Sequence, residues 1–270
     1  MLDLLESSRD VRPERRWHAA SQLSVVIPTY NESARLGPYL AEIRAYLDAE
    51  YSAEYEVLVV DDGSTDATAN LVMRWAVGWP RLRLLRHSKN RGKGAAVRTG
   101  VLAATGRRIL FADADGATPI AEERRLTLAL SKGAAVASGS RYVPGPGVIR
   151  RRNVRREVAS TVFRTAARWL IGVGVRDTQC GFKMFRAEAA RTLFSTGAET
   201  GYLFDLEVLA LARRTGFGVA EVAVNWSERP GSKLRFIRDS LRMFAGLWRL
   251  RRRLRMLPIA PVRVEHRQAA

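Results

Sequence analysis

The chain has 270 residues, 47% of them hydrophobic, so it can bury one large core and is not a disordered chain. Its 45 Lys and Arg residues against 27 Asp and Glu residues give a formal net charge of +18, which predicts anionic partners such as phosphorylated ligands, anionic membranes or nucleic acid. The single cysteine, Cys180, excludes an internal disulfide, and the three scattered histidines form no zinc-type cluster.

The first residues of the chain, 1–21, form a charged lead-in without the apolar core of a signal peptide. No later stretch reaches the roughly 20 apolar residues that a membrane-spanning helix needs. The longest candidate, 165–175, is interrupted by Arg168. We therefore expect a protein that is soluble or lies on a membrane surface.

From residue 22 onward, short apolar segments alternate with longer amphipathic segments. The predicted strands are 23–27, 55–60, 82–85, 108–112 and 134–137. The predicted helices between them are 33–49, 65–77, 94–104 and 120–130. This alternation predicts an α/β fold with a mostly parallel central sheet and helices on both faces. Ligands of such sheets bind beyond the carboxyl ends of the strands.

Polar clusters with acidic residues follow three of the predicted strands, at 28–32 (PTYNE), 61–66 (DDGSTD) and 113–115 (DAD). In the last cluster, Asp113 and Asp115 are spaced so that their side chains can converge on one hard cation such as Mg²⁺ or Mn²⁺. An Asp-rich turn explains that fragment equally well by itself. The acidic groups at the other strand ends favour a ligand site.

The loop 90–94 (NRGKG) carries two cations, Arg91 and Lys93, directly before a predicted helix. A glycine-containing loop at a helix N-terminus can place such cations near a diphosphate. A flexible basic turn is an equally good explanation of the same residues.

Two basic amphipathic helices are predicted in the second half of the chain. The apolar stripe of the first consists of Val154, Val158, Val162 and Trp169, and that of the second consists of Ile237, Leu241, Phe244 and Trp248. Either stripe alone is typical of a helix packed on a core. Two such helices in one chain, both with Trp and Arg, favour contact with a membrane interface.

Seven segments together resemble a known family. VVIPTYNE (25–32), VVDDGSTD (59–66), NRGKGAAVRTG (90–100) and DADGAT (113–118) are similar to glycosyltransferase family 2, which has the GT-A fold. GSRY (139–142), RDTQCGFKMFR (176–186) and VNWSERPGSKLR (224–235) resemble, more narrowly, the dolichyl-phosphate β-glucosyltransferases and their prokaryotic polyprenyl-phosphate counterparts.

The resemblance implies a Rossmann-like GT-A catalytic domain. We expect that domain at 22–235, with an amphipathic insertion at about 150–171, followed by a basic amphipathic helix at 236–257 and a tail at 258–270. The resemblance covers about residues 22–250.

The resemblance also implies a nucleotide-sugar site. Its expected residues are Pro28, Tyr30, Glu32, Asp61, Asp62, Arg91, Lys93, Asp113 and Ala114. The first three would flank the base and ribose, and either Asp61 or Asp62 would accept a hydrogen bond from the uracil ring. Asp113 and Asp115 would hold Mg²⁺ or Mn²⁺ against the donor diphosphate, where the metal assists departure of the nucleotide.

A lipid-phosphate acceptor would need cations and hydroxyl donors beside the metal. The candidates are Ser140, Arg141, Arg229, Ser232 and Lys233. For each cation, a solvated surface charge is the simpler explanation. A phosphate oxygen is already anionic, so it can attack the anomeric carbon, with inversion, without a strong base.

A saccharide hydroxyl as acceptor would instead need a base. Asp205 at the rim of the site is the candidate catalytic residue for that role, although helix N-capping also explains it. Glu207 points away from Asp205 on the same helix, so the two carboxylates cannot both face the site.

The function implied is inverting transfer of a hexose, favoured as glucose from UDP-glucose, to polyprenyl or dolichyl phosphate. The enzyme would be cytoplasmic and peripheral on the inner face of the cell membrane, in contact with anionic lipid.

The alternatives are a family 2 enzyme with a saccharide-hydroxyl acceptor in cell-envelope polysaccharide synthesis, and a basic nucleic-acid-binding protein. Because no helix-turn-helix, RNP or zinc pattern occurs, we expect no nucleic-acid partner. Mannose or an N-acetylhexosamine as the sugar stays open, as do lipid length, a membrane-protein partner and a homo-oligomer.

Overall fold

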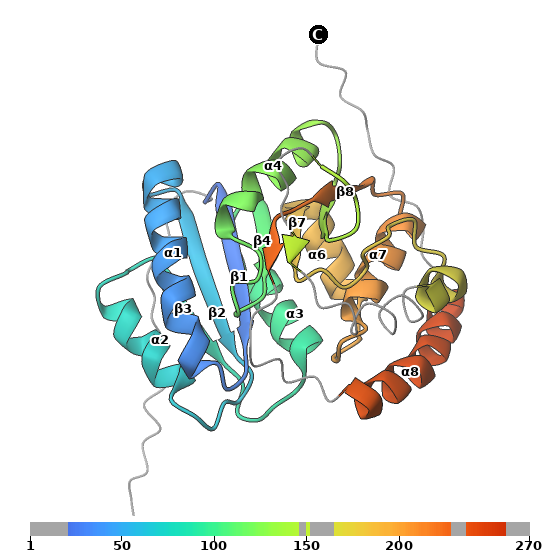
Figure 1. Cartoon of the computed structure of the whole chain (residues 1–270), viewed down its shortest axis with the longest axis horizontal. Coiled ribbons are helices and arrows are strands. Elements are labelled where there is room, and N and C mark those ends of the chain that lie inside the picture. Colours follow the sequence, from blue (N-terminus) through green and yellow to red (C-terminus); the bar gives the residue numbers. More distant parts are fainter. Residues whose placement is uncertain (1–20, 146–149, 152–164, 228–235, 258–270) are drawn as a thin grey trace, which may run out of the picture.

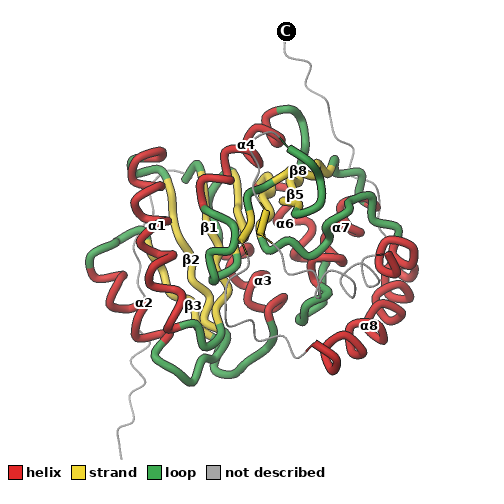
Figure 2. The backbone as a smooth tube through the Cα atoms, viewed as in Figure 1, coloured by secondary structure: helices red, strands yellow, loops and turns green. Residues whose placement is uncertain are grey.

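A computed structural model describes residues 21–145, 150–151, 165–227 and 236–257. A central sheet of seven strands lies between two layers of helices (Figures 1 and 2). The strands follow the order β3-β2-β1-β4-β7-β5-β8 across the sheet, and a separate two-stranded sheet pairs β6 with β9. The predicted α/β architecture with a mostly parallel sheet is confirmed.

The first half of the chain contains the regular alternation predicted from the sequence. Its elements are β1 (Leu23–Thr29), α1 (Ser33–Tyr51), β2 (Tyr55–Asp61), α2 (Thr68–Val77), β3 (Leu82–Arg86), α3 (Lys93–Ala103), β4 (Arg108–Ala112), η1 (Ile120–Glu122), α4 (Glu123–Ser131) and β5 (Val136–Ser140). The predicted helix at 120–130 therefore begins with a 3₁₀ turn.

The second half departs further from the sequence-based expectation. Its elements are β6 (Arg150–Arg151), β7 (Phe182–Arg186), α6 (Ala187–Thr196), α7 (Phe204–Arg214), β8 (Val219–Ala223), β9 (Trp226–Ser227) and α8 (Phe236–Met256). Residues 165–171 are also helical. Strand β7 runs antiparallel between β4 and β5, whereas the other neighbouring strands of the large sheet are parallel. As a result, β1, β2, β4 and β5 all end at the same edge of the sheet.

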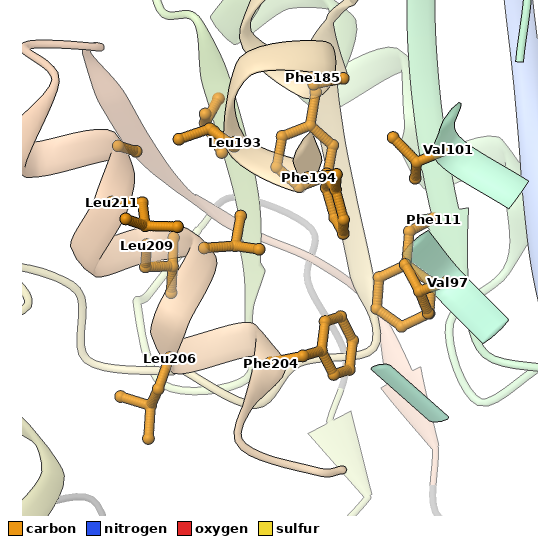
Figure 3. Packing of buried hydrophobic residues seen from close by; sticks show 14 of the residues in the cluster. Val97, Val101, Phe111, Phe185, Leu193, Phe194, Phe204, Leu206, Leu209 and Leu211 are labelled. Atoms are coloured by element: carbon orange, nitrogen blue, oxygen red, sulfur yellow. The ribbon is translucent and has the colours of Figure 1, made fainter. Parts of the chain in front are cut away.

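The sheet is buried on both faces because its strands alternate their side chains between two apolar cores. Val26, Leu58 and Phe111 pack toward α3, α6, α7 and α8, and their neighbours along the strands pack toward α1, α2 and α4. Figure 3 shows Phe204 of α7 beside Phe111 of β4, with ring centroids 5.5 Å apart at a steep angle. This contact fixes the first turn of α7 behind the end of β4.

Helix α8 packs into the same core through Leu247, Leu250 and Leu254, all of which are buried. In the apolar stripe predicted for this helix, Trp248 is 63% exposed. In the other predicted amphipathic helix, Trp169 is 80% exposed. The structure does not describe the other apolar side chains named for these two stripes. Among the helices that the structure describes, none is both long and apolar enough to cross a membrane.

Candidate active site

The loops that follow β1 and β2 are joined by Asn31, which has a left-handed backbone with φ of 54°. Its side-chain Oδ1 accepts hydrogen bonds from the backbone N–H groups of Thr65 at 2.8 Å and Asp66 at 3.3 Å. Its own N–H donates to the Ser64 hydroxyl at 2.8 Å. The two loops expected to hold a nucleoside therefore form one unit, and sequence reasoning assigned no role to Asn31.

The residues expected to flank the nucleoside differ in their exposure. Tyr30 is 38% exposed at the edge of the sheet, and Pro28 is buried as part of β1. The Glu32 carboxylate forms an ion pair with Arg35 at 2.7 Å. Tyr30 is therefore partly accessible, while Pro28 lies inside the strand.

The adjacent carboxylates Asp61 and Asp62 have different environments. Asp62 accepts hydrogen bonds from the His87 ring at 2.7 Å and from the backbone N–H groups of Arg91 and Gly92 at 2.9 and 2.8 Å. Asp61 Oδ1 accepts one hydrogen bond, and its Oδ2 lies 3.0 Å from Arg86 Nε but makes no hydrogen bond within the described part of the chain. Asp62 thus organises the basic loop, whereas Asp61 is buried and forms an ion pair with Arg86.

The basic loop 90–94 lies against the chain between α6 and α7. Gly92 has a φ of 102°, and a Cβ atom there would meet the carbonyl oxygen of Thr200. A Cβ at Gly94 would meet the same segment, at the Glu199 carbonyl oxygen. The close approach explains why glycines alternate with cations in this loop. Arg91, which precedes Gly92, is exposed.

Asp113 and Asp115 follow β4 at the carboxyl edge, next to the first residue of α3. Lys93 Nζ lies 2.6 Å from Asp113 Oδ1 and 5.3 Å from the centre of the Phe111 ring. Burial opposes the charge of Lys93, but Asp113 raises the pKa of this amine above its ordinary value. Ala114 lies between the two carboxylates and is buried. It therefore separates the two carboxylates and offers little surface to a nucleotide-sugar donor.

The two carboxylates fit a divalent metal that also binds a phosphorylated ligand. Burial and the nearby charge of Asp113 both raise the pKa of Asp115, which is what two carboxylates sharing one site produce. Among the described residues there is no cluster of three or more His, Cys, Asp or Glu side chains that could hold a metal ion. Oxygen ligands from two carboxylates plus substrate phosphates are the usual environment of Mg²⁺.

The sequence led us to expect Asp205 at the rim of the site. The structure instead places it in the first turn of α7, where it is only 3% exposed. Its Oδ1 accepts from Lys183 Nζ at 2.7 Å, and the same amine donates to the Cys180 carbonyl at 2.6 Å. Burial raises the pKa of Asp205, and the charges of Lys183 and Lys93 oppose that rise. Asp205 is therefore one half of a buried ion pair and does not face solvent as a free base.

Glu207 points away from Asp205, as predicted. Its Oε2 accepts hydrogen bonds from the backbone N–H groups of Ala198 at 2.9 Å and Glu199 at 2.7 Å, and its Oε1 pairs with Arg253 of α8. Glu207 thus ties α8 to the segment that packs against the basic loop.

Arg141, one of the two expected acceptor residues at the end of β5, is held by a second buried carboxylate. Asp177 forms a two-pronged ion pair with Arg141, at 2.8 Å to Nε and 2.9 Å to Nη2. Arg141 also lies 5.5 Å from the centre of the Trp226 ring. The Ser140 hydroxyl accepts from the backbone N–H groups of Tyr142 and Val143, so it shapes the turn. The remaining candidates, Arg229, Ser232 and Lys233, lie outside the described residues.

Sequence reasoning missed three groups of this site, which are Asp177, Lys183 and Gly181. Each belongs to the segment 176–186 that carried the resemblance, but no local pattern assigns its partner. Asp177 binds Arg141 and Lys183 binds Asp205. The Cys180 thiol between them is buried, and burial raises its pKa to about 12, so it is protonated at neutral pH.

The fold and the site define the class of protein: a GT-A type α/β protein with two carboxylates and a basic loop at the carboxyl edge of its sheet. A sequence model of the family described as glycosyl transferase family 2 matches residues 24–194. The chain belongs to glycosyltransferase family 2. It is similar to the dolichyl-phosphate beta-glucosyltransferase of Homo sapiens, with 38% identity over 260 residues, covering 87% of this chain and 80% of the human protein. The Saccharomyces cerevisiae enzyme of the same name is 35% identical, with 83% and 72% covered.

Solved structures share the fold at lower sequence identity. Glucosyl-3-phosphoglycerate synthase from Mycobacterium tuberculosis, in complex with Mn²⁺ and UDP-glucose, superposes with a TM-score of 0.64 at 20% identity, covering 86% of this chain and 79% of that one. Mannosyl-3-phosphoglycerate synthase from Rubrobacter xylanophilus gives a TM-score of 0.62 at 22% identity, covering 87% and 74%.

Proposed function

We propose that this enzyme transfers glucose from UDP-glucose to a polyprenyl or dolichyl phosphate, with inversion at the anomeric carbon. The observation that carries the proposal is the meeting of Asp113, Asp115 and Lys93 at the carboxyl edge of the sheet, where ligands of α/β folds bind. The names of the relatives supply the sugar and the acceptor, because several are dolichyl-phosphate beta-glucosyltransferases at 35–41% identity.

The donor would lie across the ends of β1, β2 and β4. Tyr30 would contact the base, and Asp61 would accept from the uracil N–H with the oxygen that makes no other hydrogen bond in the described part of the chain. Asp113 and Asp115 would hold Mg²⁺ or Mn²⁺, which when bound neutralises charge on the departing diphosphate. Lys93, already beside Asp113, would hold a phosphate oxygen.

The acceptor is proposed to be a phosphate because the described residues around Asp113 offer cations and no free base. Asp205 is buried against Lys183, so a hydroxyl acceptor would find its expected base already paired. Arg141 keeps donors beyond the two that bind Asp177 and can offer them to an incoming phosphate. Arg229, Ser232 and Lys233 complete the proposed acceptor site as a prediction from the sequence alone.

We further propose that the enzyme is peripheral on the inner face of the cell membrane and contacts it through α8. Trp248, Arg249, Arg252, Arg255 and Met256 are all exposed. Their spacing places them along one face of the helix, opposite the buried leucines. Each cation near an anionic leaflet contributes about 1 kcal/mol. A membrane-facing α8 would hold the active site where a lipid acceptor resides.

The donor and metal claims are tested by a screen of UDP- and GDP-sugars with polyprenyl phosphate and Mn²⁺. We expect UDP-glucose to give labelled lipid and Asp115→Ala to abolish it, while thermal unfolding is unchanged. No labelled lipid with any of these donors would overturn the proposal.

The membrane claim needs a separate test, because deleting α8 would remove core residues. The exposed cations can be reversed instead, as Arg249→Glu with Arg252→Glu and Arg255→Glu. We expect this variant to lose flotation with anionic vesicles and to keep its unfolding temperature. Flotation equal to that of the wild type would overturn the role of α8.

A further inference from the structure

The carboxylate of Asp113 lies directly against the backbone of Gly181. A Cβ atom built on Gly181 would overlap the Asp113 carboxylate, including both Cγ and Oδ2, and would lie 2.8 Å from Oδ1. Carbon and oxygen atoms in ordinary contact are separated by more than 3 Å. Only a residue without a side chain leaves room for Asp113 in its present orientation.

The backbone of the two residues is joined as well. The Asp113 N–H donates to the Gly181 carbonyl at 2.9 Å, which extends the antiparallel pairing of β4 with β7 by one residue beyond Ala112 and Phe182. Strand β7 thus fixes the point at which the chain turns out of β4 toward the two carboxylates. The predicted parallel alternation contained no such strand.

Gly181 lies in a short segment whose other polar residues also hold charged groups of the site. Asp177 holds Arg141, and Lys183 holds Asp205. Gly181 lies between these two residues in the chain. Because it has no side chain, it leaves room for the Asp113 carboxylate. The segment 177–183 therefore positions charges on three different elements.

We propose that Gly181 is a positioning residue for the metal-binding carboxylate, since it sets the orientation in which Asp113 meets both Lys93 and the cation. This inference rests on the proposed function, which assigns the metal to Asp113 and Asp115. Gly181 is not among the glycines with positive φ, so its backbone conformation also suits alanine. Because a new methyl group would displace the tip of a short side chain and not a backbone segment, Gly181→Ala should misplace the carboxylate and keep the fold.

The test measures Mn²⁺ binding directly, by the loss of the free-Mn²⁺ electron paramagnetic resonance signal in the presence of UDP. Gly181→Ala should weaken Mn²⁺ binding about 10- to 100-fold, the usual effect of losing a group that orients a metal ligand. Its unfolding temperature should stay close to that of the wild type. Gly78→Ala is the matched control, because a Cβ at Gly78 meets nothing within 4 Å.

A second variant separates positioning from general damage. In an Asp113→Ala background the obstructed carboxylate is gone, so adding Gly181→Ala should cause no further loss of Mn²⁺ affinity. Equal Mn²⁺ affinity in wild type and Gly181→Ala, or additive losses in the double variant, would overturn the role of Gly181. Absence of Mn²⁺ binding by the wild type with UDP would instead overturn the proposed metal site.

Discussion

Removing Lys183 should expose the cost of the buried ion pair beneath the site. Lys183→Met leaves the Asp205 carboxylate 3% exposed without its partner. Breaking a buried pair in this way costs about 3–5 kcal/mol. Because Lys93 also stabilises the charge of Asp205, we expect the lower end, about 3 kcal/mol. For a domain of this size that corresponds to a fall of roughly 6–12 °C in the unfolding temperature.

The destabilisation should depend on pH with a defined sign. Burial already raises the pKa of Asp205, and losing Lys183 removes a charge that opposed the rise. The folded variant therefore binds a proton more readily than the unfolded chain, and its deficit relative to the wild type should shrink as the pH falls. Urea unfolding followed by circular dichroism at neutral and acidic pH measures this difference.

Replacing both partners distinguishes structure from catalysis. Lys183→Met with Asp205→Leu leaves no unpaired buried charge, so we expect it to regain most of the lost stability. If Asp205 were a general base, this double variant would lose about 10²- to 10⁴-fold in kcat. We expect kcat to fall by less than about tenfold, which is a small share of a general base's effect. A loss of several hundredfold with unchanged Mn²⁺ affinity would refute the reasoning, as would a Lys183→Met variant as stable as the wild type.

Three further predictions concern the loops around the site. Asp62→Ala removes the hydrogen bonds that hold the basic loop. It should raise the KM for UDP-glucose about tenfold and cost about 2 kcal/mol of stability. An unchanged KM would contradict this prediction. Arg253→Ala leaves buried Glu207 without its cation and should cost about 1–2 kcal/mol in urea unfolding; a loss no larger than that of exposed Arg252→Ala would contradict it. Although partial burial opposes the change, hydrogen bonds from Thr68 and Ser33 lower the pKa of Asp66 to about 2. The stabilising effect of the Asp66 carboxylate is therefore present above the ordinary Asp pKa and is lost as the pH falls toward 2. Asp66→Asn should consequently flatten the dependence of unfolding stability on pH between about pH 4 and 2. An unchanged slope would count against this prediction.

The elements up to β5 could be predicted because their apolar spacing is local. Strand β7 could not, because its five residues pair with β4, 70 to 78 positions earlier in the chain, and nothing in their own pattern specifies an antiparallel partner. The missed strand matters for function, since it carries Lys183 and follows Gly181. The pairing of Asp205 with Lys183 is equally invisible in the sequence, which places the two residues 22 positions apart.

The different roles of adjacent residues were also difficult to predict from the sequence alone. Asp61 and Asp62 have the same chemistry, and only the position of the basic loop decides that Asp62 binds its backbone. In α8, apolar and basic residues alternate on more than one face. Docking beside Leu203, where Gly246 permits a close approach, selects Leu247 for burial and leaves Trp248 exposed.

The central claim is that a lipid phosphate receives glucose from UDP-glucose. Its most direct test incubates the purified protein with labelled UDP-glucose and Mn²⁺ and compares three acceptors: polyprenyl phosphate, the same polyprenol without phosphate, and 3-phosphoglycerate. We predict label in the lipid fraction with polyprenyl phosphate only. Transfer to the unphosphorylated polyprenol or to phosphoglycerate, or no transfer to polyprenyl phosphate, would contradict it.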